Sequence, residues 1–178
     1  VAQVAHSLRQ GLQRMRAGLS VHCAFLEHCS PTPAQVVGQL VKQGITEIVL
    51  VPLQLTHAID PDERALVQAT KLRTVHPELR IQVSRPIGPE VSLLTVLDQR
   101  LRSSLSTSRV LELDGLVLSS ARSGDVRGNA LLARRARQWS THHRLPCLTG
   151  VADGSGPSVA QAIQGLRAQG RRHIAVGS

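Results

Sequence analysis

The spacing of apolar residues along the chain predicts an alternating series of helices and strands. Apolar positions recur every three or four residues over 1–19, 33–43, 62–75, 90–105, 129–139 and 159–169, which is the spacing of one buried helix face. Short apolar runs, typical of strands, occur at residues 21–26, 48–53, 79–83, 115–119, 147–151 and 173–176. Because the two kinds of segment alternate, the pattern predicts an α/β fold with parallel sheets flanked by helices.

Two of the predicted helices begin with the same capping signal. Thr32 is followed three residues later by Gln35, and Ser158 is followed in the same way by Gln161. In such a capping box, the hydroxyl and the amide side chain each satisfy a backbone N–H that the first turn leaves free. Gly44 follows the first of these helices, at the position where a left-handed residue ends a helix.

The matching caps belong to a repeat in which the second part of the chain follows the first at an offset of 126 residues. We therefore expect two similar α/β units, residues 1–107 and 108–178, each with a parallel sheet of about four strands. At this offset Val1 aligns with Arg127, so we expect the first unit to lack its first strand and the second to be incomplete at its carboxyl end. The aligned positions are Pro31, Ala34, Gln35, Leu40, Gln43, Gly44 and Ile48 with Pro157, Ala160, Gln161, Leu166, Gln169, Gly170 and Ile174.

The loop after residues 48–53 is the first candidate for a functional site. The run is apolar throughout, so we expect a strand buried on both faces, and Pro52 marks its end because proline cannot donate a hydrogen bond to a sheet. Thr56, His57 and Asp60 follow directly. Ligands of open α/β sheets bind at the carboxyl ends of the strands, and no other histidine in the chain directly follows a buried strand.

The charge of the chain indicates an anionic partner. Its 21 lysines and arginines exceed its 12 acidic residues, for a net charge of +9. A nucleic acid, a small polyanionic substrate and a merely solvated basic surface all fit this charge. Phe25 and Trp139 are the only aromatic residues besides histidine, which leaves little for stacking on bases and makes nucleic acid the weaker interpretation.

Cysteine usage and apolar run lengths indicate a cytoplasmic location. The three cysteines form no Cys-x-x-Cys pair, so reduced thiols fit better than a disulfide framework. No apolar run approaches the ~20 residues that a membrane span needs, and no signal peptide is evident.

Several short motifs together resemble one enzyme family. They are Val21–Glu27, Ser30-Pro31, Gly44, Val51-Pro52-Leu53, His57, Asp60-Pro61, His76-Pro77 and Pro86-Ile87-Gly88. In order and spacing they are similar to the CbiX/SirB-type sirohydrochlorin chelatases, a group of class II tetrapyrrole chelatases. The resemblance covers residues 1–105 well and the rest loosely. It implies a lyase that inserts Co²⁺ or Fe²⁺, as substrate, into sirohydrochlorin for cobalamin or sirohaem synthesis, without an organic cofactor, as a monomer of two pseudo-symmetric halves or a dimer.

The resemblance also implies roles for individual residues. His57 matches one of the two metal-binding histidines of the family, and the other would lie before Val1. Asp60 follows His57 as in the family, and Thr56, Asp60 and Arg85 are our candidates for substrate binding. Here the run before His57 is the shorter Gln54-Leu55-Thr56, without the family's glycine. Glu27 ends a predicted strand on the same side, where a carboxylate can assist proton removal, although a solvated glutamate fits its position equally well.

The chemistry of metal insertion fits a histidine independently of the family. The ligand must bind a divalent cation and then release it, and a base must take the two pyrrole protons. A neutral imidazole can do both near neutral pH, and its nitrogen suits cobalt and ferrous iron better than magnesium or calcium.

In the second half, the corresponding loop lacks a histidine. Ser123-Gly124-Asp125 and Asn129 resemble the family's first loop, but Ala121 occupies the position of the histidine. We therefore expect this half to hold no metal and to form the second wall of the cleft.

Three further groups have simpler interpretations than a functional site. His22-Cys23 with Glu27-His28-Cys29 suggests zinc, but neighbouring strand residues point to opposite faces, so a buried, inert Cys23 is the better interpretation. His142-His143 is expected at the surface, and Gly154-Ser155-Gly156 is expected to be a turn. Two alternative functions remain: a degenerate relative that binds tetrapyrrole or metal without catalysis, and a nucleic-acid-binding protein.

Overall fold

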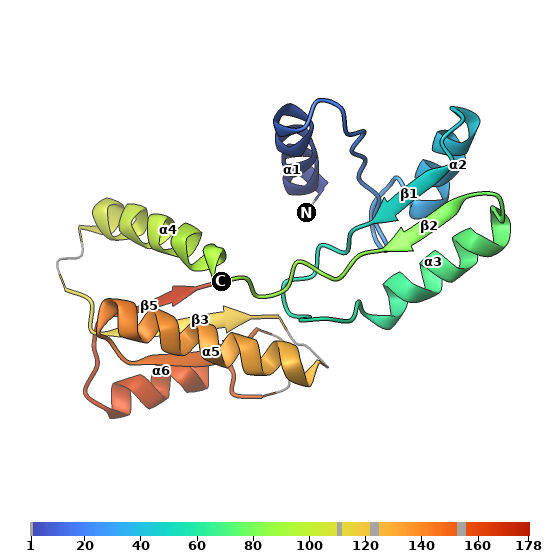
Figure 1. Cartoon of the computed structure of the whole chain (residues 1–178). Helices are drawn as coiled ribbons and strands as arrows, with labels where there is room; N and C mark the ends of the chain where they lie inside the picture. Colours follow the sequence, from blue (N-terminus) through green and yellow to red (C-terminus); the bar gives the residue numbers. More distant parts are fainter. Residues whose placement is uncertain (1, 110–111, 122–124, 153–155) are drawn as a thin grey trace. The chain divides into compact units, whose positions relative to one another are not determined.

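The computed structural model describes residues 2–109, 112–121, 125–152 and 156–178 (Figure 1). The chain forms two compact units, each of which is described here by itself. The first unit comprises Val1–Pro52 and Asp62–Ser84, and the second comprises Leu53–Pro61 and Arg85–Ser178. Ser123, Gly124, Gly154 and Ser155, named above for their motifs, lie outside the described residues.

The first unit is a two-stranded parallel sheet with two helices packed on one face. Ile48 of β1 pairs with Ile81 of β2, and both side chains belong to the core. Val37 of α2 and Leu72 of α3 cover this face, and both are buried. The elements of this unit are α1 (Ala2–Met15), α2 (Pro33–Lys42), β1 (Glu47–Leu50), α3 (Glu63–Val75) and β2 (Arg80–Val83).

The other face of this small sheet is open, which corrects the prediction of a strand buried on both faces. Val49 points to the open side and is 53% exposed. Its neighbours there are polar: Glu47 lies 3.6 Å from Arg80 and accepts a hydrogen bond from Gln82. The strand formed by the apolar run at residues 48–53 therefore has one face packed against the helices and one exposed face. The strand is also shorter than predicted, ending at Leu50 instead of Leu53.

Residues 21–26 do not form the predicted strand. Their burial alternates as expected for an extended segment, with Phe25 buried, but no neighbouring backbone pairs with them in a sheet. The Phe25 N–H donates to the carbonyl of Pro31, within the same loop. The pattern of side chains predicted the extended shape correctly, whereas the pairing partner was not evident from it.

The second unit is a three-stranded parallel sheet covered on both faces. The strand order is β4-β3-β5, so β3 is central (Figure 1). Leu116 and Leu118 of β3 pack on one side against Trp139 of α5, and Val117 packs on the other side against Leu166 of α6. The elements are α4 (Ser92–Ser108), β3 (Gly115–Ser120), α5 (Val126–His143), β4 (Cys147–Val151), α6 (Val159–Ala168) and β5 (Ile174–Gly177).

The observed units differ from the expected halves, residues 1–107 and 108–178. Helix α4 packs in the second unit, because Leu94, Leu97 and Leu101 contact the core cluster that contains Leu116 and Trp139. The described sheets have two and three strands, fewer than the four or so expected in each unit. The boundary near residue 107 was inferred from the sequence repeat. The internal duplication that the repeat indicates stays a prediction.

Both predicted capping boxes are confirmed. The Thr32 hydroxyl accepts from the Gln35 N–H at 3.3 Å, and the Ser158 hydroxyl accepts from the Gln161 N–H at 3.1 Å. Gly44 takes the expected left-handed conformation, with φ of +80°. These equivalences support the predicted internal duplication, which itself stays a prediction.

The predicted α/β class, with parallel sheets flanked by helices, is confirmed. Among the described helices, none combines the length and the apolar character that crossing a membrane requires.

Candidate active site

The loop that carries His57 belongs to the second unit, although β1 and α3 on either side of it belong to the first. The segment that follows β2 holds this loop from one side. Gly88 donates its N–H to the carbonyl of Gln54 at 2.9 Å. Its φ is +71°, and a Cβ there would lie 3.0 Å from the carbonyl oxygen of His57. Glycine at this position therefore allows both the turn and the close approach of the loop.

Asp125 holds the same loop from the other side. One carboxylate oxygen accepts a hydrogen bond from the Ala58 N–H at 2.7 Å, and the other accepts from the Arg127 N–H at 2.9 Å. The second bond makes Asp125 the N-cap of α5. One side chain thus ties the residue after His57 to the first turn of a helix.

Hydrogen bonding keeps Asp125 ionised. The bond from Ala58 is the main cause that lowers its pKa; burial opposes the shift, and bonds from the Gly128 and Arg127 amides assist it. The charge of His57 lowers the pKa of Asp125 further, which indicates that this carboxylate acts electrostatically on the imidazole.

Gly128, in the first turn of α5, is required by the same contact. A Cβ at this position would overlap the carbonyl oxygen of Thr56, a backbone atom that cannot move without moving the loop. Gly128 is buried. The first turn of α5 and the His57 loop therefore approach each other to backbone distance.

Four of the five residues selected from the sequence lie in the second unit. His57 and Thr56 are half-buried, and the Thr56 hydroxyl lies 3.4 Å from His57 Nδ1. Asp60 and Arg85 are exposed, one near the end of the loop and the other at the start of the segment that contains Gly88. The structure thus places a histidine, a hydroxyl, a carboxylate and a guanidinium on two adjoining segments.

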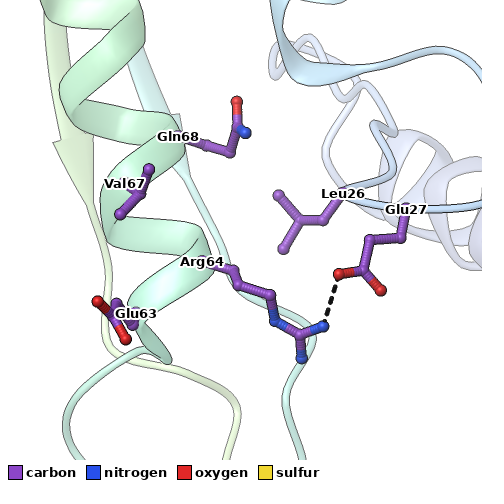
Figure 2. Close-up of a pocket in the computed structure, with 6 residues that line it drawn as sticks. All are labelled: Leu26, Glu27, Glu63, Arg64, Val67 and Gln68. Carbon is purple, nitrogen blue, oxygen red and sulfur yellow. Dashed lines mark hydrogen bonds and ion pairs between the residues drawn. The ribbon is translucent and has the colours of Figure 1, made fainter.

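Glu27, the fifth selected residue, belongs to the first unit. Its carboxylate pairs with Arg64 of α3 at 2.8 Å (Figure 2). His28 Nε2 lies 3.6 Å from the same carboxylate. This ion pair raises the pKa of Arg64, with Asp62 contributing through a second contact at 3.2 Å. Glu27 and Arg64 line a shallow hollow of about 220 Å³, whose remaining lining residues are Leu26, Glu63, Val67 and Gln68.

A second hollow, of about 240 Å³, lies in the second unit at the carboxyl ends of β3 and β4. Ser120, Asn129 and Thr149 supply its polar groups. Ala121 also lines it, at the position that the sequence analysis matched to the family's histidine. The described lining contains hydroxyls and an amide but no histidine, cysteine or carboxylate. The prediction that this half holds no metal is in keeping with that chemistry and stays a prediction.

The zinc alternative for the first unit receives no support in the described part of the chain. Cys23 is half-buried, and its thiol donates to the carbonyl of Ala5 at 3.2 Å. The one group of three metal-ligating side chains found among the described residues is Asp98 with His142 and His143, in the second unit.

Sequence reasoning missed the roles of Asp125 and Gly128. Asp125 was noted only as part of a motif, although an aspartate just before a helical pattern signals an N-cap. A glycine three residues inside a helix is unfavourable by itself, so Gly128 signals a close backbone approach. Neither signal identifies the partner, because the His57 loop is 67 residues away from Asp125.

Comparison with known proteins identifies the family and the fold of the chain. The CbiX family model matches residues 1–104. The chain is similar to the solved structure of SirB from Bacillus subtilis with Fe³⁺, with a TM-score of 0.71 and 22% identity. The match covers 99% of this chain and 71% of the SirB chain. The sirohydrochlorin chelatase SirB from Bacillus subtilis subspecies spizizenii, in complex with cobalt, matches with a TM-score of 0.68 and 18% identity. That match covers 98% of this chain and 80% of the other. No curated protein matches. The chain described here belongs to the CbiX family.

Proposed function

We propose that this protein inserts Co²⁺ or Fe²⁺ into sirohydrochlorin, and so serves sirohaem or cobalamin synthesis. The observation that carries the proposal is the placement of His57: it lies in the loop after β1, and Asp125 and two glycines hold that loop. Membership of the CbiX family supports it. So does the similarity of fold to chelatases whose structures contain Fe³⁺ and cobalt.

His57 is the metal ligand in this proposal. Thr56 faces Nδ1, which leaves Nε2 as the atom that offers a lone pair to the metal. A single imidazole nitrogen binds cobalt or ferrous iron strongly enough to position it and weakly enough to release it to the macrocycle. The loop's fixed backbone orients the ring, because both neighbours of His57 are held: Thr56 against Gly128, and Ala58 by Asp125.

Metal insertion also requires two proton acceptors. Each pyrrole N–H that the metal replaces releases one proton. Once the metal has passed to the macrocycle, the imidazole of His57 is free to accept one of these protons. We assign Glu27 as a second acceptor, with its pairing to Arg64 as the contact that positions the carboxylate.

The surrounding residues suit an anionic macrocycle. Sirohydrochlorin carries carboxylates around its rim, and Arg85 is an exposed arginine in the same unit as His57, at the start of the segment whose Gly88 bonds to the His57 loop. We assign Thr56 and Asp60 to hydrogen bonds with the same substrate. The net charge of +9 attracts such a ligand from a distance.

The proposal is tested by replacing His57 with alanine and following the absorbance of sirohydrochlorin after addition of cobalt or ferrous salt. The insertion rate is expected to fall on the order of 100-fold, as for loss of an acid–base group, while folding is retained. His173→Gln is the matched control, because it removes an exposed histidine of the second unit that has no role in this site. An insertion rate of the alanine variant equal to that of the parent would refute the role of His57.

A second candidate function follows from the shortened run Gln54-Leu55-Thr56, which has no glycine. It is a protein that binds tetrapyrrole or metal without inserting one into the other. A parent protein that shifts the sirohydrochlorin spectrum without producing the metallated form would favour this function over the chelatase.

A further inference from the structure

A second group of metal-ligating side chains lies outside the candidate active site. Asp98 of α4, together with His142 and His143 at the end of α5, forms what we call the Asp98 cluster. His143 Nε2 lies 2.8 Å from one carboxylate oxygen, and His142 Nε2 lies 3.4 Å from the other. One ligand atom from each of the three residues lies within 4.8 Å of the other two. The expectation of a surface position is confirmed for His142, which is exposed, and is wrong for His143, which is half-buried beside Asp98.

The cluster lies at the far end of α5 from His57. Asp125 and Gly128 hold the His57 loop at the first turn of this helix, whereas His142 and His143 are its last two residues. At a rise of 1.5 Å per residue, the length of α5 places the two ends about 25 Å apart. The Asp98 cluster is thus separate from the proposed insertion chemistry and does not depend on it.

The carboxylate of Asp98 is held in place by a third contact. Trp139, which is 1% exposed, donates its indole N–H to the oxygen that also faces His143, at 2.7 Å. Burial disfavours ionisation of Asp98, but the bonds from His143 and Trp139 outweigh it, so that its pKa lies below the ordinary value. In metal sites, a hydrogen-bond donor outside the ligand set commonly holds a ligating carboxylate in position, as Trp139 does here.

The distances fit a first-row transition metal. Zinc-like ions bind histidine nitrogen and carboxylate oxygen at about 2.0–2.2 Å, which puts tetrahedral ligands about 3.4 Å apart. His142 and His143 reach different oxygens of the Asp98 carboxylate, at 3.4 and 2.8 Å, and one ligand atom from each residue lies within 4.8 Å of the others, so small side-chain movements bring the three to this separation. Two imidazoles and one carboxylate favour Zn²⁺, Co²⁺, Ni²⁺ or Cu²⁺ over Mg²⁺ or Ca²⁺, which prefer oxygen.

His142 distinguishes a metal site from a structural hydrogen-bond group. Asp98, His143 and Trp139 alone account for a buried network that fastens α4 to α5. His142 is not needed for that network, since its side chain is 61% exposed and contacts the His143 ring, yet its Nε2 faces the same carboxylate. We propose, against the expectation that the second half holds no metal, that Asp98, His142 and His143 bind a divalent first-row transition metal ion that clamps α4 to α5, with water at the remaining position.

The test uses the His57→Ala protein as the reference, so that metal at the candidate active site does not contribute. Metal-free protein is titrated with Co²⁺ at about pH 7.5, where an ordinary histidine is neutral, and the visible d–d bands of low-coordinate cobalt are recorded. Bands are expected in the reference. His142→Gln and His143→Gln are expected to weaken binding by at least the roughly 10- to 100-fold that loss of a second-layer contact costs. His173→Gln, which removes an exposed histidine elsewhere, should bind as the reference does.

Thermal unfolding gives an independent readout of the clamp. Saturating Zn²⁺ is expected to raise the unfolding midpoint of the reference, because an ion that binds only the folded state stabilises it. His142→Gln should keep the midpoint of the metal-free protein but lose the increase. A reference protein without cobalt bands, or a His142→Gln variant that binds and gains stability as the reference does, would overturn the proposal.

Discussion

Two similar apolar runs meet different surroundings in the two units. The run at residues 48–50 lies in β1, with Val49 53% exposed, whereas the run at residues 116–118 forms the middle of β3, with Val117 fully buried. The difference lies in the neighbours. β3 has a strand on each side and helices on both faces, while β1 has one partner strand and helices on one face. An apolar run thus predicts a strand, and its neighbours decide how much of it is buried.

Replacing valine with alanine on each strand tests this difference most strongly. Val117→Ala is expected to lower the free energy of unfolding by about 2–3 kcal/mol, from lost burial and the cavity left behind. Val49→Ala makes the same chemical change on an exposed position and should cost within about 0.5 kcal/mol. Urea unfolding followed by far-UV circular dichroism measures both. Equal costs would show that the open face of β1 is covered in solution.

Glycines in helices of the two units should respond in opposite directions. Gly128→Ala in α5 forces a methyl group against the Thr56 carbonyl, so we expect the His57 loop to be displaced at a cost of about 1–2 kcal/mol. Gly38→Ala in α2 meets no atom within 4 Å and should stabilise by about 0.5–1 kcal/mol, as alanine favours helix.

Amide hydrogen exchange at Ala58 gives the local readout for Gly128→Ala, because this N–H bonds to Asp125. The variant should exchange faster there and insert metal more slowly, with the sheet of the second unit still protected. Unchanged exchange at Ala58 would contradict the close approach between α5 and the loop.

The capping boxes offer the smallest effect and the closest match between the units. Thr32→Ala and Ser158→Ala each remove one side-chain acceptor for the first turn of a helix, and each is expected to cost about 1 kcal/mol. Thermal or urea unfolding of the two variants provides the comparison. A difference larger than about 1 kcal/mol would argue against equivalent roles for α2 and α6 in a duplicated fold.

Local signals in the sequence predicted much of this fold. Thr32 with Gln35 and Ser158 with Gln161 located two helix starts, because a capping box is a short-range interaction between residues three apart. The alternation of helices and strands along the chain predicted the α/β class, because each element is recognised from the local spacing of its apolar residues. Residues 21–26 show the limit: their side chains alternate as in a strand, but strand formation also needs a partner, which is not a local property.

The candidate site was predictable in part. His57 was identified because it follows a predicted strand directly; in the structure this strand ends at Leu50, and His57 lies in the loop after it. The contact of its loop with Asp125 and Gly128 depends on how distant segments pack, and no local pattern encodes it. His143 was placed at the surface for a similar reason, since Asp98 and Trp139, the residues that surround it, lie on two helices.

The bond between Ala58 and Asp125 has a consequence for the order in which the protein takes shape during synthesis. Ribosomes add about 5–20 residues per second, so the 67 residues that separate the two partners take roughly 3–13 s to make. Until residue 128 has emerged, the loop with His57 has neither its carboxylate anchor nor the helix turn against which it rests. The growing chain thus exposes its principal candidate ligand for seconds before that ligand acquires a fixed position.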